Sequence, residues 1–343
     1  MSKSLLLGVA IAFTTTAFSQ TDSSAFFLNK GLDEKDRGRR AESLKQFEKA
    51  YQYNKNSKEV ISELAAAYLD LRKYAQAKEK FLTLETMGEK TDSTYRQLML
   101  LSFSMRQFDD AIKYASALKR AYPAEKTAYY LGKSFYEKDD LGNAIKYLDI
   151  AAKENPENAD IPYTVARSYS DMQNFAKAIP YFQKAVELNP TQNRWIYEMA
   201  LIYYGMNDDK NSLKYMLLAA EKGYKKDNEY TQNLATAYLN AGQPSEGIAM
   251  LKELLARRPN DKALLNSIAE AYYNAKMYDD AIASWDVVLQ NDKKDAEALY
   301  MIGVSYQKKG EKEKGMAICD KAIEMDPSLQ GLKKEMKMPG NGF

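Results

Sequence analysis

Histidine is absent from this 343-residue chain, and cysteine occurs only once, at Cys319. Without histidine the chain cannot build a Ser-His-Asp or Cys-His catalytic arrangement, nor a zinc site that uses imidazole. A single cysteine excludes an intrachain disulfide and a metal site made of several thiolates. The sequence also lacks the glycine patterns of P-loops and dinucleotide-binding turns. These absences predict a protein that is not an enzyme and that uses no cofactor or metal.

Charge and hydropathy exclude two further classes. The formal net charge is only +2, so there is no cationic excess of the kind that nucleic-acid-binding proteins show. Apolar residues make up 45% of the chain and charged residues 28%, which is typical of a folded protein. The apolar run from Leu5 to Phe13 is about half of the ~20 residues needed to span a bilayer. We therefore predict no nucleic-acid partner and no membrane span.

The first residues have the pattern of an export signal. Lys3 precedes the apolar run, and Ala17 and Ser19 supply the small side chains that signal peptidases select. We expect residues 1–19 to be removed, which would leave Gln20 first; an uncleaved anchor and a buried first helix are the alternatives. No cysteine follows the run, which excludes a lipoprotein. The segment resembles signal peptides of the bacterial Bacteroidetes group, so we expect a periplasmic or secreted protein.

A unit of about 34 residues repeats through the rest of the chain. One position of the unit holds a small residue in most copies; its nine occupants are Gly31, Ala65, Met99, Gly132, Ala166, Ala200, Ala235, Ala269 and Gly303. The steps between them are 34, 34, 33, 34, 34, 35, 34 and 34 residues. An aromatic residue follows three places later in seven copies, as Tyr68, Phe135, Tyr169, Tyr203, Tyr238, Tyr272 and Tyr306. This register is too regular to arise by chance.

The second half of each unit repeats in the same register. A second small position is occupied by Ser43, Ala77, Ala111, Ala144, Ala178, Ser212, Gly247, Ala281 and Gly315. An apolar residue lies four places further on, as Phe47, Phe81, Ala115, Leu148, Phe182, Met216, Leu251, Trp285 and Cys319. Five copies then close with a proline, at Pro123, Pro156, Pro190, Pro259 and Pro327. Cys319 therefore occupies a core position, and we predict a buried, unreactive thiol.

These spacings predict two helices per unit. Apolar residues recur three and four places apart, which gives each half one apolar helical face. The two small positions allow the paired helices to approach closely, and the proline ends the second helix. These recurring small, aromatic, large apolar and proline positions resemble those of the tetratricopeptide repeat family. That resemblance implies an all-α fold: a right-handed α-solenoid of about nine helix-turn-helix repeats with a C-terminal capping helix.

The expected organisation has three parts. Residues 1–19 form the signal peptide, residues 20–327 the solenoid, and residues 328–343 a capping helix followed by a disordered tail. The third copy departs from the pattern, because Met99 occupies a small position and Ser102 an aromatic one. Gly247 and Gly315 should weaken two second helices by up to ~1 kcal/mol each relative to alanine. None of these departures breaks the register.

In the resembled family the first helix of each pair lines a concave face. The lining is mostly apolar in the early copies, for example at Leu32 and Phe103, and polar in the last ones, for example at Asn266 and Glu270. The middle copies combine tyrosines with cations, and we select them as candidate partner-binding residues: Tyr129, Lys133, Tyr136, Tyr163, Arg167, Arg194, Tyr197 and Tyr204. Tyrosine offers contact area and a hydroxyl at low entropic cost.

Two interpretations of this face remain open. In the first, Lys133 and Arg167 bind an acidic peptide; in the second, these cations pair with Glu137, Asp160 and Asp171 on a solvated surface. The leading functional hypothesis is a non-catalytic scaffold that binds a partner protein or extended peptide in the bacterial envelope, as part of an envelope or secretion complex. The alternative is a glycan or small-ligand receptor that uses the tyrosine-rich groove.

Overall fold

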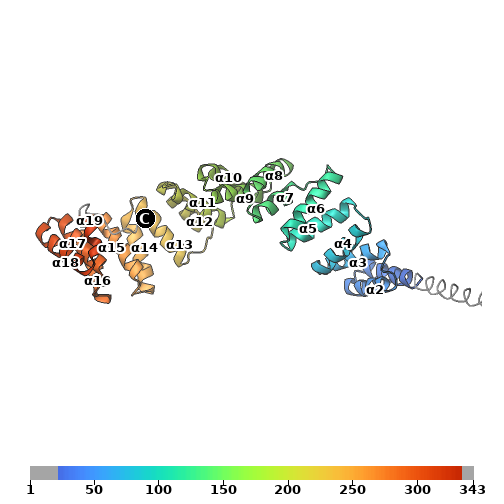
Figure 1. The fold of residues 1–343 in the computed structure, drawn as a ribbon, viewed down its shortest axis with the longest axis horizontal. Helices are drawn as coiled ribbons and strands as arrows, with labels where there is room; N and C mark the ends of the chain where they lie inside the picture. Colours follow the sequence, from blue (N-terminus) through green and yellow to red (C-terminus); the bar gives the residue numbers. More distant parts are fainter. Residues whose placement is uncertain (1–21, 334–343) are drawn as a thin grey trace, which may run out of the picture. The chain divides into compact units, whose positions relative to one another are not determined.

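The computed structural model describes residues 22–333 and divides the chain into two units at Lys184 and Ala185. Unit 1 is a succession of paired helices, drawn from blue to green in Figure 1. Its helices are residues 22–36, α2 (Arg40–Tyr53), α3 (Lys58–Asp70), α4 (Tyr74–Thr86), α5 (Asp92–Ser104), α6 (Phe108–Ala121), α7 (Ala128–Glu137), α8 (Leu141–Glu154), α9 (Asp160–Asp171) and α10 (Phe175–Leu188), whose last turn extends past the boundary.

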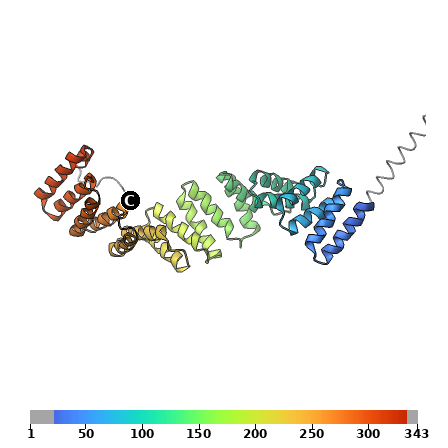
Figure 2. The same ribbon diagram turned by 90° about the horizontal axis from the view of Figure 1, so that it is seen from below.

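Unit 2 continues the same alternation (yellow to red in Figure 1). Its helices are α11 (Asn193–Gly205), α12 (Asp209–Glu221), α13 (Asn228–Asn240), α14 (Pro244–Arg257), α15 (Lys262–Asn274), α16 (Tyr278–Asn291), α17 (Ala296–Lys309) and α18 (Lys312–Met325), followed by the 3-10 turn η1 (Pro327–Leu329) and α19 (Gln330–Lys333). Figure 2 shows the two helices of each terminal pair side by side. The predicted all-α fold of nine helix pairs is confirmed for residues 22–333.

The ends of the helices follow from local sequence. Five first helices begin after a side chain that accepts a hydrogen bond from the backbone of the first turn, namely Ser57, Thr91, Asp227, Asp261 and Asp295. The five predicted proline stops are confirmed, because α6, α8, α10, α14 and α18 each end two residues before a proline. The predicted signal peptide and residues 334–343, on which the predicted tail falls, lie outside the described residues. Within residues 22–333 no helix is long and apolar enough to cross a bilayer.

The small position of the first helix packs against the large apolar position of the second. A Cβ atom placed on Gly132 would lie 2.6 Å from Cγ of Leu148, and one on Gly303 would lie 2.6 Å from Sγ of Cys319. In these two repeats the helices therefore pack so closely that a side chain at the small position would force its neighbours to shift. Gly315 is held in the same way, because its Cβ would meet the backbone of α17. The sequence led us to expect that Gly315 weakens α18, but the close packing of α18 against α17 requires glycine at this position.

The third repeat fills these two positions in reverse. Met99 occupies the small position and Ala115 the large one, and both are buried, with exposed fractions of 2% and 0%. Ser102 stands where other copies have an aromatic ring, and it is fully buried. The departure at Met99 and Ala115 is an exchange of volume between paired helices, and this repeat has a continuous core with its neighbours.

Each first helix is followed by a tight turn with one residue in the left-handed conformation. Its nine occupants are Gly38, Arg72, Arg106, Asp139, Gln173, Asn207, Gly242, Lys276 and Gly310, all with positive φ. Six of them are not glycine, and a side chain in this region of φ, ψ costs about 1 kcal/mol. The turn recurs because it reverses the chain within three residues and lets the second helix return along the first.

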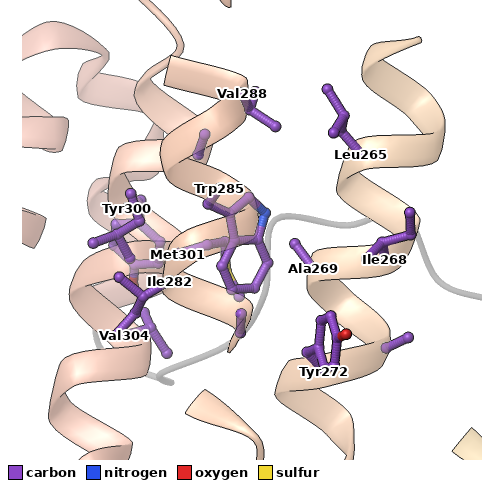
Figure 3. Packing of buried hydrophobic residues seen from close by; sticks show 14 of the residues in the cluster. Leu265, Ile268, Ala269, Tyr272, Ile282, Trp285, Val288, Tyr300, Met301 and Val304 are labelled. Atoms are coloured by element: carbon purple, nitrogen blue, oxygen red, sulfur yellow. The ribbon is translucent and has the colours of Figure 1, made fainter. Parts of the chain in front are cut away.

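The largest core of unit 2 lies between α15, α16 and α17. Trp285 is buried at its centre, facing Ala269 and Ile268 of α15 on one side and Met301 of α17 on the other (Figure 3). Side chains of consecutive repeats therefore pack into one common core. A helix pair of this core buries its apolar face against the neighbouring pair.

Candidate partner-binding faces

The candidate residues of unit 1 lie on first helices that are in contact. Tyr129, Lys133 and Tyr136 belong to α7, Tyr163 and Arg167 to α9, and α7 and α9 touch directly. We call the surface formed by these five residues the unit 1 face. The structure therefore brings these five together, whereas Arg194, Tyr197 and Tyr204 belong to α11 of unit 2.

Asp160 connects two of the candidate residues. Its Oδ2 accepts a hydrogen bond from the Tyr129 hydroxyl at 2.8 Å and forms an ion pair with Nζ of Lys133 at 3.0 Å. Nζ of Lys133 also donates to the hydroxyl of Thr164 at 3.2 Å, and the Lys133 side chain is only 17% exposed. The charge of Lys133 is therefore balanced inside the protein, as the second interpretation of the sequence predicts for this residue.

The other three side chains form a second set of contacts. The Tyr136 hydroxyl donates to Oδ2 of Asp171 at 3.0 Å, and the Arg167 guanidinium lies 5.8 Å from the centre of the Tyr136 ring. Arg167 also donates to the Tyr163 hydroxyl at 3.4 Å. Burial, together with the facing carboxylates, raises the pKa of Tyr129 and of Tyr136, so both hydroxyls stay protonated donors. Each ring is thereby fixed in orientation.

Aromatic rings extend this face toward α5. The ring of Phe103 lies 5.3 Å from that of Tyr130 and 6.5 Å from that of Tyr129, in edge-to-face or tilted geometry. Phe108, at the start of α6, adds a further edge contact to Phe103 at 6.1 Å. All of these rings are half-buried, so each keeps part of its surface in contact with solvent. Sequence reasoning found Phe103 but not Phe108 or Tyr130.

The candidate residues of α11 behave differently. Tyr197 is only 5% exposed, and its ring is stacked on Tyr224 at a centroid distance of 4.4 Å, while Asn233 donates to its hydroxyl at 2.7 Å. Arg194 is exposed and pairs with Glu198 at 2.9 Å. Tyr204 is half-buried.

Tyr224 supplies the ring that covers Tyr197. It comes from the loop between α12 and α13, which sequence reasoning did not consider. The signal was present in the sequence, because the step from Ala200 to Ala235 is one residue longer than the usual 34.

The possible metal ligands and the single thiol were the remaining candidates for chemistry. Between residues 22 and 333 no three acidic or thiol side chains come together as a possible metal site. Cys319 is 2% exposed, and its sulfur accepts a hydrogen bond from Gln307 at 3.3 Å, so the prediction that this thiol is buried is confirmed.

Comparison with known families supports the repeat assignment. Models described as tetratricopeptide repeat match residues 233–293 and residues 296–329. A model described as anaphase-promoting complex, cyclosome, subunit 3 matches residues 104–208. The chain is a tetratricopeptide repeat protein. Tetratricopeptide repeat arrays are protein–protein interaction scaffolds, and that coarse function applies here. The family as a whole is generally non-catalytic.

Individual relatives add the fold but no activity. Tetratricopeptide repeat protein 21B of Xenopus laevis is 29% identical over 147 residues, which is 42% of this chain but only 11% of that protein. The C-terminal part of a tetratricopeptide repeat protein from Cytophaga hutchinsonii is 18% identical, covers 80% of this chain and 99% of its own, and has a TM-score of 0.50. YrrB, described as a tetratricopeptide repeat protein with an unusual peptide-binding site, is 24% identical over 55% of this chain and 98% of its own, with a TM-score of 0.43.

The last tetratricopeptide repeats present a first-helix surface of another kind. Glu270 on α15 is half-buried, and no described residue makes a hydrogen bond or an ion pair with its carboxylate. Burial and the negative charge of Glu297 on α17 raise the pKa of Glu270 above its ordinary value. Asn266 and Tyr273 flank Glu270 on the same helix. We call Asn266, Glu270, Tyr273 and Asn274 the α15 face.

Proposed function

We propose that this chain is a non-catalytic scaffold of the bacterial envelope that binds an extended segment of a partner protein across the unit 1 face. The observation that carries the proposal is the set of half-exposed rings whose orientation is fixed before binding. The hydroxyls of Tyr129 and Tyr136 are held by Asp160 and Asp171 on the next first helix. Rings fixed in this way lose little entropy when a partner packs against them.

The chemistry of the face favours contact through rings more than through charge. Lys133 already faces Asp160, and the Arg167 guanidinium lies against the Tyr136 ring. An acidic partner would have to compete with carboxylates that the protein itself supplies. The proposal therefore keeps the protein partner expected from the sequence but makes apolar and aromatic side chains its main contacts.

The envelope location rests on the first nineteen residues. A basic start, an apolar run and the Ala17-x-Ser19 exit are the features that export requires. Intact-mass measurement of the protein from an envelope fraction tests this directly. A mass that begins at Gln20 supports export, whereas a full-length chain confined to the cytoplasmic fraction contradicts it.

The binding proposal is tested with Tyr136→Ala and a matched control, Tyr74→Ala. Tyr74 is an exposed tyrosine on α4, a second helix. Each full-length variant is immobilised, and partners are captured from an envelope extract, identified by mass spectrometry and then purified for measurement of Kd. Loss of a central aromatic contact costs about 2 kcal/mol, so Tyr136→Ala should weaken Kd about 30-fold. Tyr74→Ala should bind like the wild type.

The same experiment decides between partner classes. A captured protein whose affinity is unaffected by Tyr136→Ala would place the contact elsewhere and contradict the unit 1 face. Retention of the wild-type chain on peptidoglycan or polysaccharide resin, lost in Tyr136→Ala, would instead support the receptor alternative, because sugars also stack on exposed rings. Thermal melts of both variants show whether a loss of binding reflects unfolding.

A further inference from the structure

Glu270 differs from Asp160, the carboxylate that contacts Tyr129 and Lys133 of the unit 1 face, in having no counter-charge. Asp160 accepts a hydrogen bond from the Tyr129 hydroxyl and forms an ion pair with Lys133. In contrast, no lysine or arginine among the described residues forms an ion pair with Glu270. The charge that acts on its pKa, that of Glu297, has the same sign. A half-buried carboxylate without a cation loses hydration and gains nothing in return. The folded chain therefore carries an uncompensated negative charge on a first helix.

The surroundings of Glu270 also offer unused hydrogen-bonding groups. Asn266 lies one turn before it and Asn274 one turn after it, and neither side chain hydrogen-bonds to another described residue. The Tyr273 ring is fixed by edge contacts with Tyr278 at 5.7 Å and with Trp285 at 6.2 Å. Its position is set by packing, and it provides an aromatic surface beside a negative charge. Amides beside an extended partner can bind its backbone.

A cavity of about 350 Å³ adjoins this face. It is lined by Leu239, Asn240, Gly242, Pro244, Ala271, Asn274 and Ala275, and so lies between α13, the start of α14 and the end of α15. Ala271 directly follows Glu270, and Asn274 belongs to both the cavity wall and the α15 face. The lining is mainly apolar, so the cavity suits an aliphatic side chain.

We propose that the α15 face binds a lysine or arginine of an extended partner segment, with its cationic group on Glu270 and a neighbouring aliphatic side chain in the adjoining cavity. The proposal rests on the proposed protein-binding function and adds a second contact region with defined chemistry. A cation is the occupant that the charges favour, because Glu270 and Glu297 repel an anion. The Tyr273 ring can add a cation–π contact to the same group.

The test uses the full chain and a phage-displayed library of random peptides. Peptides that bind the wild type are counter-selected against Glu270→Lys, and the Kd of the survivors is measured by fluorescence anisotropy. Charge is controlled with Glu246→Lys, since Glu246 is exposed on the second helix α14. We expect peptides rich in lysine or arginine next to an aliphatic residue. Their Kd should rise about 10-fold with Glu270→Gln and at least about 100-fold with Glu270→Lys.

Three results would overturn the inference: no selected peptide, selected peptides without a basic residue, or a Kd equally affected by Glu246→Lys. None of them removes the scaffold function, which is decided separately by Tyr136→Ala and the captured envelope partner. Conversely, Glu270-dependent peptides obtained from a chain that captures no partner through the unit 1 face would support the α15 face alone. Raising the salt concentration should weaken the Glu270-dependent peptides, because the contact is between charges at a partly exposed site.

Discussion

The first helices α7 and α9 of unit 1 and the first helix α15 of unit 2 occupy equivalent repeat positions but differ in how their polar groups are satisfied. Lys133 and Glu270 stand at the same place in their repeats, one after the small residue. Lys133 is paired with Asp160 on the next first helix, whereas the charge that acts on Glu270 from the next first helix is the like charge of Glu297. The charge of a residue at this repeat position therefore does not reveal whether it is available to a partner. What decides is the residue 27 places later, in the first turn of the next first helix, which is Asp160 for Lys133 and Glu297 for Glu270.

Charge reversal at these two positions should give the largest contrast. Lys133→Glu should lower the free energy of unfolding by about 2–3 kcal/mol, because Asp160 would then face a like charge in a half-buried place. Glu270→Lys should leave stability within about 0.5 kcal/mol or raise it, because it removes a repulsion with Glu297. Urea unfolding of both variants measures the difference. Lys153→Glu, an exposed change on α8, is the control, and equal effects at Lys133 and Glu270 would erase the distinction between the faces.

The packing beneath the surfaces gives a second test, with a smaller effect. Gly315→Ala should destabilise by about 1–3 kcal/mol, because the new Cβ would meet the backbone of α17. Gly142→Ala on α8 should instead stabilise by about 0.5–1 kcal/mol, since nothing lies within 4 Å of its Cβ and alanine favours the helix. Thermal melts compare the two. If Gly315→Ala also stabilised the chain, the two helices could not be as close as the structure has them.

Two of the turns after first helices, one in each unit, differ in their left-handed residue, and the expected effect is smaller. Gln173 occupies this position after α9, and Gly242 occupies the equivalent position after α13. Gln173→Gly should stabilise by about 0.5–1 kcal/mol, and Gly242→Gln should destabilise by a similar amount. Chemical denaturation of the pair checks the sign. Opposite shifts of comparable size are expected, and shifts in the same direction would contradict the assigned backbone conformation.

The smallest expected effect is the pH dependence of Glu270. Because its pKa is raised in the folded chain, the folded state holds a proton over a range above pH 4.5 in which the unfolded state has lost it. The free energy of unfolding attributable to this group therefore falls as pH rises through that range. Glu270→Gln should remove the fall, so its melting temperature should exceed that of the wild type increasingly from pH 4.5 upward. Parallel melting curves for the two proteins would show that Glu270 is ordinarily solvated.

The repeat itself could be read from the sequence because it is a pattern of side-chain volumes. A small residue followed sixteen places later by a large apolar one, as at Gly132 and Leu148, can be recognised in the sequence. In the structure these two residues pack against each other. The third repeat could not be read in this way. Position-by-position reading treats Met99 and Ala115 as two separate departures, whereas their volumes compensate each other across a helix pair.

The candidate faces were less accessible to sequence reasoning. The expected lining of the first helices placed Lys133, Tyr129 and Tyr136 on one surface, and all three lie on α7. Whether Lys133 turned toward solvent or toward Asp160 depended on side-chain rotation across two helices, and the spacing left both open. The covering of Tyr197 by Tyr224 came from a loop one residue longer than usual, and loop length does not fix where a ring will lie. Glu270 appeared in the polar lining, but its lack of a counter-ion is visible only in the structure.

The single thiol allows local opening of the last repeat to be measured by chemical modification. Cys319 lies at the seam between α17 and α18, with Gly303 pressed against its sulfur. A thiol-specific reagent can reach this buried sulfur only while α17 and α18 are locally separated. Since no other cysteine competes for the reagent, the rate of modification counts openings of the C-terminal repeat in the unmodified, full-length protein. The rate can be followed with a bound peptide present and absent, which shows whether a partner seated on α15 also closes the end of the array.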